Sequence, residues 1–197
     1  MIITLTLDKI KIFEENLCIK FSKELLDELT VNNTIREKTV SYKFNYENRE
    51  LRLECPLIKN SSGKNIVLCP AIKLPFRSYP IYVYLHAIAM YLSTNMSMRE
   101  VAKKIRQEYQ LETFAHTTLS RALRKLANAI CKLVQIVEHT CSNPPNVVAK
   151  KHFSSTMLKI YKVLMALISP ILDRSQRVEF SAMLNYRFFN TFHEFPL

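Results

Sequence analysis

Residues 97–132 read SMREVAKKIRQEYQLETFAHTTLSRALRKLANAICK, and this stretch decides how the rest of the chain is interpreted. Ser97 with Glu100 forms the pattern of a capping box, in which each side chain accepts a hydrogen bond from the other residue's backbone N–H. A helix is therefore expected over 97–109. Its apolar residues Val101, Ile105 and Tyr109 share one face, which predicts a core-facing stripe.

A second helix is expected over 117–139, with the hydroxyl of Thr117 or Thr118 as its N-cap. Its apolar residues recur every three or four positions, which places them on one face. We call this set the Leu119–Val137 seam, and its members are Leu119, Leu123, Leu126, Ile130, Leu133 and Val137. The spacing predicts a buried face, either in the core of this chain or against a partner helix, because heptad-like repeats also suit helix pairing.

Basic and hydroxyl side chains lie away from the apolar faces of both predicted helices. Guanidinium groups can pair with guanine O6 and N7, Thr can touch a thymine methyl, and Lys can contact phosphates. The candidates for contact with bases in a DNA groove are Thr118, Arg121, Lys125 and Arg124. Of these, Arg124 can reach either a base or the phosphate backbone of the DNA. The candidates for phosphate contact are Arg99, Lys103, Lys104, Thr117 and Ser120. The alternative is that these residues are the ordinary solvated faces of amphipathic helices.

The segments SMREVAKKI and TTLSRALRKL also resemble a known family. They look like the helix-turn-helix modules of transposases and site-specific recombinases, in which a "reVA…I" helix precedes an "sTlsR.l..l" recognition helix. The resemblance covers about 40 of the 197 residues, counting a preceding helix from Ile81 as the third member of the bundle. It implies a recognition helix in the major groove of DNA. The turn Gln110–His116 departs from the pattern, because about three or four residues are usual there.

Charge is unevenly distributed along the chain. There are 28 Lys and Arg against 17 Asp and Glu, which gives a formal net charge of +11. Acidic and basic residues nearly balance over 1–54, so the positive excess falls after residue 54. Such a surface suits DNA phosphates or an anionic membrane, and a lysine-biased composition is the alternative explanation. The longest apolar runs are too short to span a bilayer.

The flanking sequence predicts a mainly α-helical protein with a small N-terminal α+β unit over 1–69. Period-two alternation predicts a strand over 2–13 and a hairpin over 39–57, and leucine spacing predicts a short helix over 22–31. Residues 58–63 are expected to form a surface loop. The expected later helices span 80–93, 97–109, 117–139, 151–169 and 174–190, which gives a helix-turn-helix bundle over 81–140 and a helical C-terminal segment with two helices over 147–197.

Three prolines punctuate residues 70–80, CPAIKLPFRSYP in context, and predict an extended connector. Lys73 and Arg77 could then act as a basic arm that enters a minor groove. The alternative is a linker that packs on the core through Ile72, Leu74 and Phe76.

No pattern predicts an enzyme, a metal site or a cofactor. The acidic residues after position 54 are not spaced as a metal-binding triad, and no Ser or Tyr nucleophile has an arginine cluster around it. Cys55-Pro56 and Cys69-Pro70 flank a hairpin-like loop, as in half of a zinc ribbon, but two thiolates do not close a tetrahedral site.

We therefore expect sequence-specific binding of double-stranded DNA, with a homodimer as one possible form. The chain would be an accessory or truncated transposase-like protein of a mobile element, or a transcriptional regulator. The alternative is a helical interaction module that pairs through the Leu119–Val137 seam. The N-terminus has no signal-peptide pattern and the cysteines form no C-x-x-C, so a cytoplasmic location is expected, associated with the nucleoid in a prokaryote.

Overall fold

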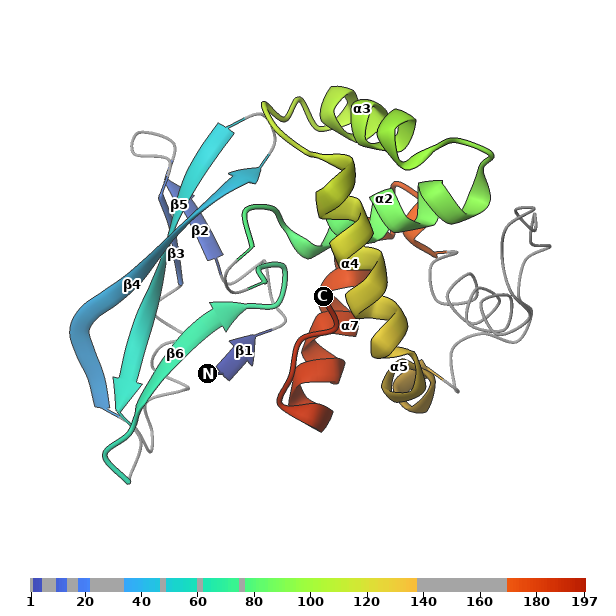
Figure 1. Cartoon of the computed structure of the whole chain (residues 1–197). Coiled ribbons are helices and arrows are strands. Elements are labelled where there is room, and N and C mark those ends of the chain that lie inside the picture. Colours follow the sequence, from blue (N-terminus) through green and yellow to red (C-terminus); the bar gives the residue numbers. More distant parts are fainter. Residues whose placement is uncertain are drawn as a thin grey trace. The chain divides into compact units, whose positions relative to one another are not determined.

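The protein is mainly α-helical with a small N-terminal β unit, as the sequence predicts (Figure 1). The chain divides into two compact units, Met1–Pro80 and Ile81–Leu197. The computed structural model describes residues 2–4, 10–13, 18–21, 34–46, 49–59, 62–74, 77–137 and 170–197. The expected helices over 22–31 and 151–169 lie outside these residues.

The first unit contains a six-stranded sheet in which one central strand, β5, pairs with three others. The strands are β1 (Ile2–Thr4), β2 (Ile10–Phe13), β3 (Cys18–Phe21), β4 (Thr34–Tyr46), β5 (Arg49–Lys59) and β6 (Asn65–Pro70). Along one edge β5 pairs antiparallel with β4. Along its other edge β5 pairs first with β3, at Arg52 and Leu53, and then antiparallel with β6, at Leu57–Lys59. β1 extends the sheet beyond β6, and β2 extends it beyond β3.

The predicted hairpin is confirmed, with Tyr46 paired to Arg49 at its turn. The predicted surface loop over 58–63 is wrong at its start, because β5 continues to Lys59 and Ile58 is fully buried. The sequence pattern does not predict β6 as a strand. Its sequence NIVLCP has no period-two alternation of polar and apolar residues. In the structure, burial increases from Asn65 to Pro70 instead of alternating.

The proline-rich segment folds back on itself and belongs to the first unit. The amide of Lys73 donates to the Pro70 carbonyl at 3.0 Å, and Lys73 forms a β-bridge with Pro80. The expectation of an extended connector is therefore wrong. Ile72 and Leu74 are buried, as the packed-linker alternative predicts, and Lys73 is buried too, so it cannot serve as an exposed arm.

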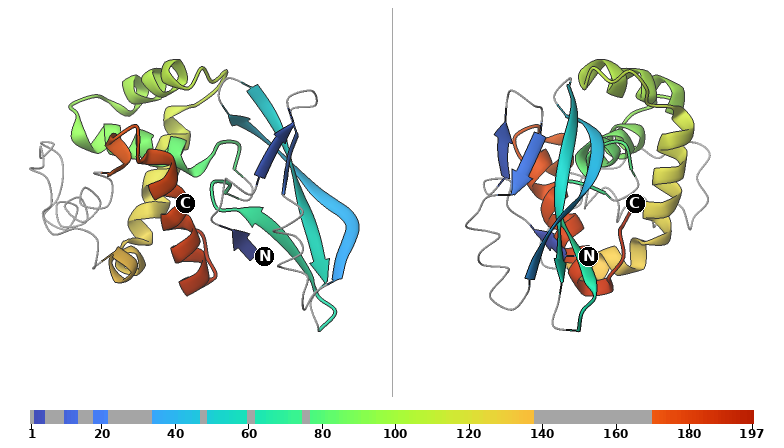
Figure 2. Two further views of the ribbon diagram at one scale, coloured as in Figure 1. Left: turned by 180° about the vertical axis from the view of Figure 1, so that it is seen from behind. Right: turned by 90° about the vertical axis from the view of Figure 1, so that its left-hand side faces the viewer.

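The second unit contains α2 (Ile81–Ser93), α3 (Met98–Glu108), α4 (His116–Asn128), α5 (Ile130–Val137) and α7 (Arg177–Phe192). Helices α2, α3 and α4 contact one another, which is the tri-helical arrangement expected, and α7 packs on α2 and α5 (Figure 2). α2 is almost entirely buried, and its buried side chains are all apolar except that of His86. It is the central helix of this unit.

The predicted capping box at the start of α3 is confirmed. The Ser97 amide donates to Glu100 Oε2 at 2.7 Å, and the Glu100 amide donates to Ser97 Oγ at 3.3 Å. Val101 and Ile105 are buried on the core side, as the stripe predicts. These two features fix where α3 begins and which face it buries.

α3 ends in a Schellman motif without the glycine that usually makes one. Gln110 has a positive φ of 47°, and the Leu111 amide donates to the Arg106 carbonyl at 2.9 Å. Leu111 and Phe114 are buried, and the Phe114 ring lies 6.0 Å from that of Tyr84 on α2. Burial of Leu111 and Phe114 thus fixes the long turn against the core of this unit.

Two details of the second predicted helix are wrong. Its N-cap is Ala115, with no side-chain cap, because the helix begins at His116, two residues before the start that a Thr117 cap would require. It also divides at Ala129 into α4 and α5, which lets α4 pack on α2 and α3 while α5 packs on α7. The described side chains of the Leu119–Val137 seam are buried inside this chain, namely Leu119, Leu123, Leu126, Ile130 and Leu133.

Candidate nucleic-acid interface

Helix α3 presents a basic face to solvent. Arg99, Lys103 and Lys104 are all exposed, as is Arg106. Arg99, Lys103 and Arg106 are spaced by four and three residues, so they share one face of the helix. The buried stripe of Val101 and Ile105 holds this face outward.

Helix α4 presents its candidate residues unequally. Thr117, Arg121, Arg124 and Lys125 are exposed, whereas Thr118 and Ser120 are half-buried. Thr117, Arg121 and Arg124 share a face by their spacing, which is opposite to the buried Leu119 and Leu126 side. Thr117, Arg121 and Arg124 are therefore the accessible candidates on one face of the predicted recognition helix, whereas Thr118 and Ser120 are partly covered.

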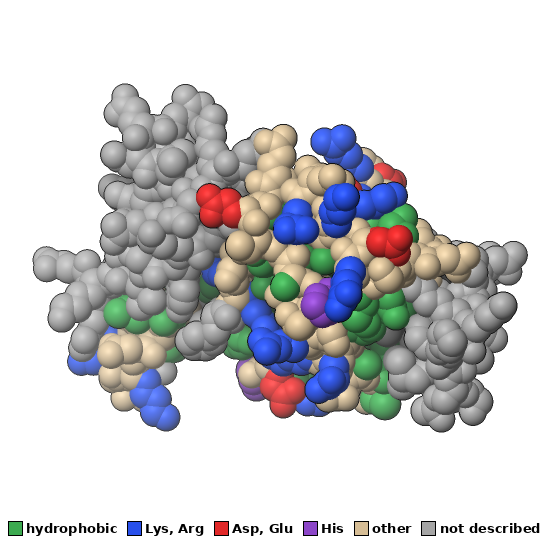
Figure 3. All heavy atoms as spheres, turned by 45° about the horizontal axis from the view of Figure 1, so that its top comes forward, with side chains coloured by type: hydrophobic (Ala, Val, Ile, Leu, Met, Phe, Trp, Pro, Cys, Tyr) green, Lys and Arg blue, Asp and Glu red, His purple; other side chains and the backbone are tan. Residues whose placement is uncertain are grey.

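Helix α3 lies across the N-terminal end of α4, as both views of the ribbon show (Figures 1 and 2). The two helices contact each other and are neighbours in this unit. Viewed with α3 forward, the surface of this unit carries many more Lys and Arg side chains than acidic ones (Figure 3). Within the described residues, no ion pair engages six of these cations, which are Arg99, Lys103, Lys104, Arg106, Arg121 and Arg124.

The end of α7 and the segment after it contact the C-terminal end of α4 and the helix that follows. Lys125 Nζ donates to the Leu197 carbonyl at 2.8 Å. Lys132 Nζ lies 2.5 Å from Glu194 Oε2 and 5.5 Å from the centre of the Phe192 ring. Lys125 is therefore less available for a groove contact than Arg121 or Arg124.

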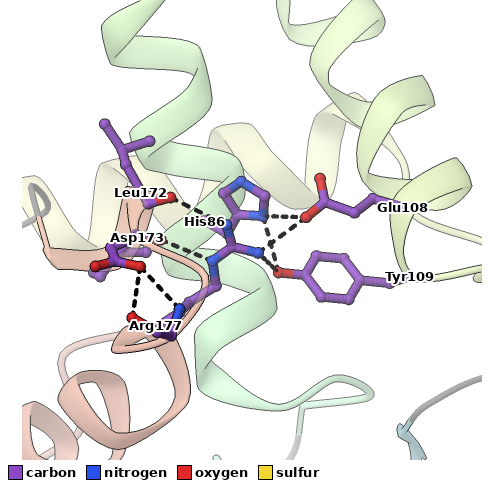
Figure 4. Close-up of polar contacts among 8 residues, drawn as sticks. His86, Glu108, Tyr109, Leu172, Asp173 and Arg177 are labelled. Atoms are coloured by element: carbon purple, nitrogen blue, oxygen red, sulfur yellow. Dashed lines mark hydrogen bonds and ion pairs between the residues drawn. The ribbon is translucent and has the colours of Figure 1, made fainter.

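A buried polar cluster joins the end of α3 to α2 and α7 (Figure 4). Arg177 is 7% exposed, and its Nη1 atom donates to Glu108 Oε1 at 2.9 Å and to the Tyr109 hydroxyl at 2.8 Å. Its Nε atom donates to the Ile171 carbonyl at 2.7 Å. His86 Nδ1 lies 2.9 Å from the same Tyr109 hydroxyl. The guanidinium therefore fixes the C-terminal end of α3, where the turn to α4 begins.

The electrostatics of this cluster favour a neutral His86 and Tyr109 beside one ion pair. Burial, with a further contribution from the Arg177 charge, lowers the pKa of His86 to about 4, and Glu108 opposes this shift. Burial raises the pKa of Tyr109 to about 12. The cluster holds the end of α3 against α2 and α7.

Two exposed residues at this surface, Arg106 on α3 and His116 at the start of α4, are not among the predicted contact residues. The sequence places Arg106 on the basic side of its helix, and its spacing to Arg99 and Lys103 would have added it to the predicted phosphate contacts. His116 could not be predicted, because the sequence places it in the turn and not in the helix.

No protein-family model, curated protein or solved structure matches this chain. In the described part of the chain, no three His, Cys, Asp or Glu side chains gather as a metal site would require. No described helix has the length and apolar character needed to cross a membrane.

Proposed function

We propose that this protein binds double-stranded DNA in a sequence-specific manner through α3 and α4. The observation that carries the proposal is the set of six exposed cations on these adjacent helices, none engaged in an ion pair with a described residue. Among the six, Lys104 interacts electrostatically with Glu100 at a distance, without forming an ion pair. Exposed Arg and Lys side chains outside ion pairs can neutralise phosphates, and this neutralisation dominates the affinity of proteins for DNA.

The two helices would contact different parts of the DNA. In a helix-turn-helix module the second helix enters the major groove with its N-terminal residues toward the bases, and the first helix crosses the backbone. Arg121 is exposed in the second turn of α4 and is the best candidate for a guanine contact. Arg99, Lys103 and Lys104 on α3, with Thr117 and Arg124, would contact phosphates.

The packing of the module supports this proposal over pairing through the Leu119–Val137 seam. A seam that pairs with a partner helix must be exposed in the free protein. Leu119 and Leu133 are fully buried in this chain, and Leu126 is 1% exposed. In this proposal the chain acts as a transcriptional regulator or as an accessory, transposase-like protein of a mobile element.

The test is a selection of bound sequences from random duplexes, carried out with the natural protein, Arg121→Ala and Lys103→Ala. We expect the natural protein to enrich a motif, Arg121→Ala to lose preference at one or two positions, and Lys103→Ala to weaken all sequences alike. Retention of the full motif by Arg121→Ala would disprove the groove assignment. Failure of the natural protein to retain any duplex would disprove DNA binding.

A further inference from the structure

The residues that follow α7 fold back onto α4 and α5. We call them the 193–197 segment, and their sequence is HEFPL. His193 caps the C-terminal end of α7 in the left-handed conformation, with φ 54°, and its amide donates to the Phe189 carbonyl at 2.7 Å. A left-handed residue at this position turns the chain away from the helix axis. Figure 1 shows the segment returning from the end of α7 toward α4.

Apolar side chains attach the 193–197 segment to the second unit. Leu197 is 2% exposed, and Pro196 is buried. The Phe195 ring lies 5.0 Å from the ring of Phe189 on α7. Burial of these side chains stabilises the docked segment without a covalent link, so docking is reversible in principle.

The polar contacts of the segment engage two lysines on the side of α4 and α5 where its apolar side chains dock. Lys125 lies four residues after Arg121, so the two side chains are neighbours on the surface of α4. Lys125 Nζ donates to the Leu197 carbonyl at 2.8 Å. On α5, Lys132 Nζ lies 2.5 Å from Glu194 Oε2. A carbonyl oxygen and a carboxylate oxygen therefore occupy positions at these two ammonium groups that phosphate oxygens would occupy on DNA.

DNA can compete for the ion pair between Lys132 and Glu194. The two side chains are 40% and 61% exposed, and an ion pair so accessible to water adds little to stability. A phosphate that pairs with the same lysine gains in addition from the release of counterions from the DNA. The polar contacts of the segment are therefore exchangeable, and its apolar side chains set how readily it leaves.

We propose that the 193–197 segment is an autoinhibitory contact, which competes with DNA phosphates for Lys125 and Lys132. This proposal rests on DNA binding through α3 and α4. While the segment is docked, DNA meets the exposed cations of α3 and the first turns of α4, such as Lys103 and Arg121. When the segment leaves, the two lysines extend the phosphate-binding surface along α4 and onto α5, and the affinity for DNA rises.

The test uses two substitutions in the full-length protein that weaken docking of the segment, each with a matched control. Glu194→Gln removes the carboxylate that engages Lys132. Its control, Glu179→Gln, removes the same charge from an exposed residue of α7 that forms no ion pair with a described residue. Leu197→Ala removes a buried side chain without changing the charge, and its control, Leu172→Ala, shortens a leucine that is already 40% exposed. The affinity for one duplex is measured by fluorescence anisotropy at a fixed salt concentration.

We expect Glu194→Gln and Leu197→Ala to bind the duplex about two- to fivefold more tightly than the natural protein, and the controls to bind nearly as it does. Lys132→Gln should change the affinity little on its own and should remove the gain of Glu194→Gln, because Lys132 reaches DNA only after release of the segment.

Two results would show that the segment does not compete with DNA. One is that neither substitution tightens binding more than its control. The other is that Lys132→Gln weakens binding equally with and without Glu194→Gln. In both cases the autoinhibitory role is wrong, whereas DNA binding stands. If none of these proteins binds the duplex, DNA binding through α3 and α4 is itself wrong, and the autoinhibitory role falls with it.

Discussion

Replacement of Arg177 by Met should weaken the second unit through one defined set of contacts. Met retains much of the length and the apolar packing of the Arg side chain but donates no hydrogen bonds. Two short bonds to neutral acceptors disappear, at 2.7 Å to the Ile171 carbonyl and at 2.8 Å to the Tyr109 hydroxyl. At about 1.5 kcal/mol for each bond from a charged donor, the expected loss is about 3 kcal/mol. The bond to Glu108 adds little, because 40% of that side chain is exposed and water can replace the guanidinium.

The measurement is urea unfolding at pH 7, followed by circular dichroism, with Arg187→Met as the matched control. Arg187 is an exposed arginine of the same helix, so its replacement should change the free energy of unfolding by less than about 0.5 kcal/mol. The pKa of His86, measured by NMR, should rise in Arg177→Met, because the Arg177 charge helps to lower it. A loss below about 1 kcal/mol, or one equal to the control's, would refute the role assigned to this cluster.

Three further changes test the account of the second unit. The free energy of unfolding should fall by up to about 3 kcal/mol as the pH decreases from 6.5 to about 4, because His86 takes up a proton in the unfolded chain but not while it is buried. The variant His86→Gln should lack this part of the pH dependence. An NMR titration midpoint of His86 near 6.5 in the folded protein would contradict the prediction. Ser97→Ala should cost about 1 kcal/mol in the same unfolding assay, whereas Thr117→Ala should cost little because Thr117 caps nothing; equal costs would contradict the cap assignments. Gln110→Gly should increase the free energy of unfolding by about 0.5–1 kcal/mol, since φ is 47° there, and a decrease would show that the Gln side chain contributes more than the backbone strain costs.

Local patterns predict the helices of this protein well where a side chain marks the boundary. Ser97 and Glu100 fix the start of α3, and the apolar spacing of Val101 and Ile105 identifies its buried face. The start of α4 has no such mark, because Ala115 is its N-cap. The pattern therefore favours a nearby hydroxyl as the cap, and that prediction is wrong. The end of α3 has no glycine to mark it, because Gln110 takes the positive φ that a glycine usually adopts there.

Long-range packing explains what the sequence does not reveal. The break at Ala129 has neither proline nor glycine to announce it, and it follows from α4 and α5 packing against different helices. Burial of Lys73 depends on the fold of the segment after β6, where Lys73 bonds to Pro70 and bridges to Pro80. The Arg177 cluster joins residues from three separate helices. For the candidate interface, the exposure of Arg99, Lys103 and Arg121 follows from helix periodicity, but the engagement of Lys125 with Leu197 does not.

The salt dependence of DNA affinity tests the central proposal most directly. The slope of log K against log salt is measured by fluorescence anisotropy on one duplex, for the natural protein and for Lys103→Gln/Lys104→Gln/Arg124→Gln. The control, Lys64→Gln/Arg174→Gln/Arg187→Gln, removes the same charge from exposed positions outside α3 and α4. We predict that the slope becomes less steep by about 0.9 for each phosphate that the first variant no longer neutralises, and that it is nearly unchanged in the control. An equal reduction in both variants would show that the net charge, and not the face of α3 and α4, binds DNA.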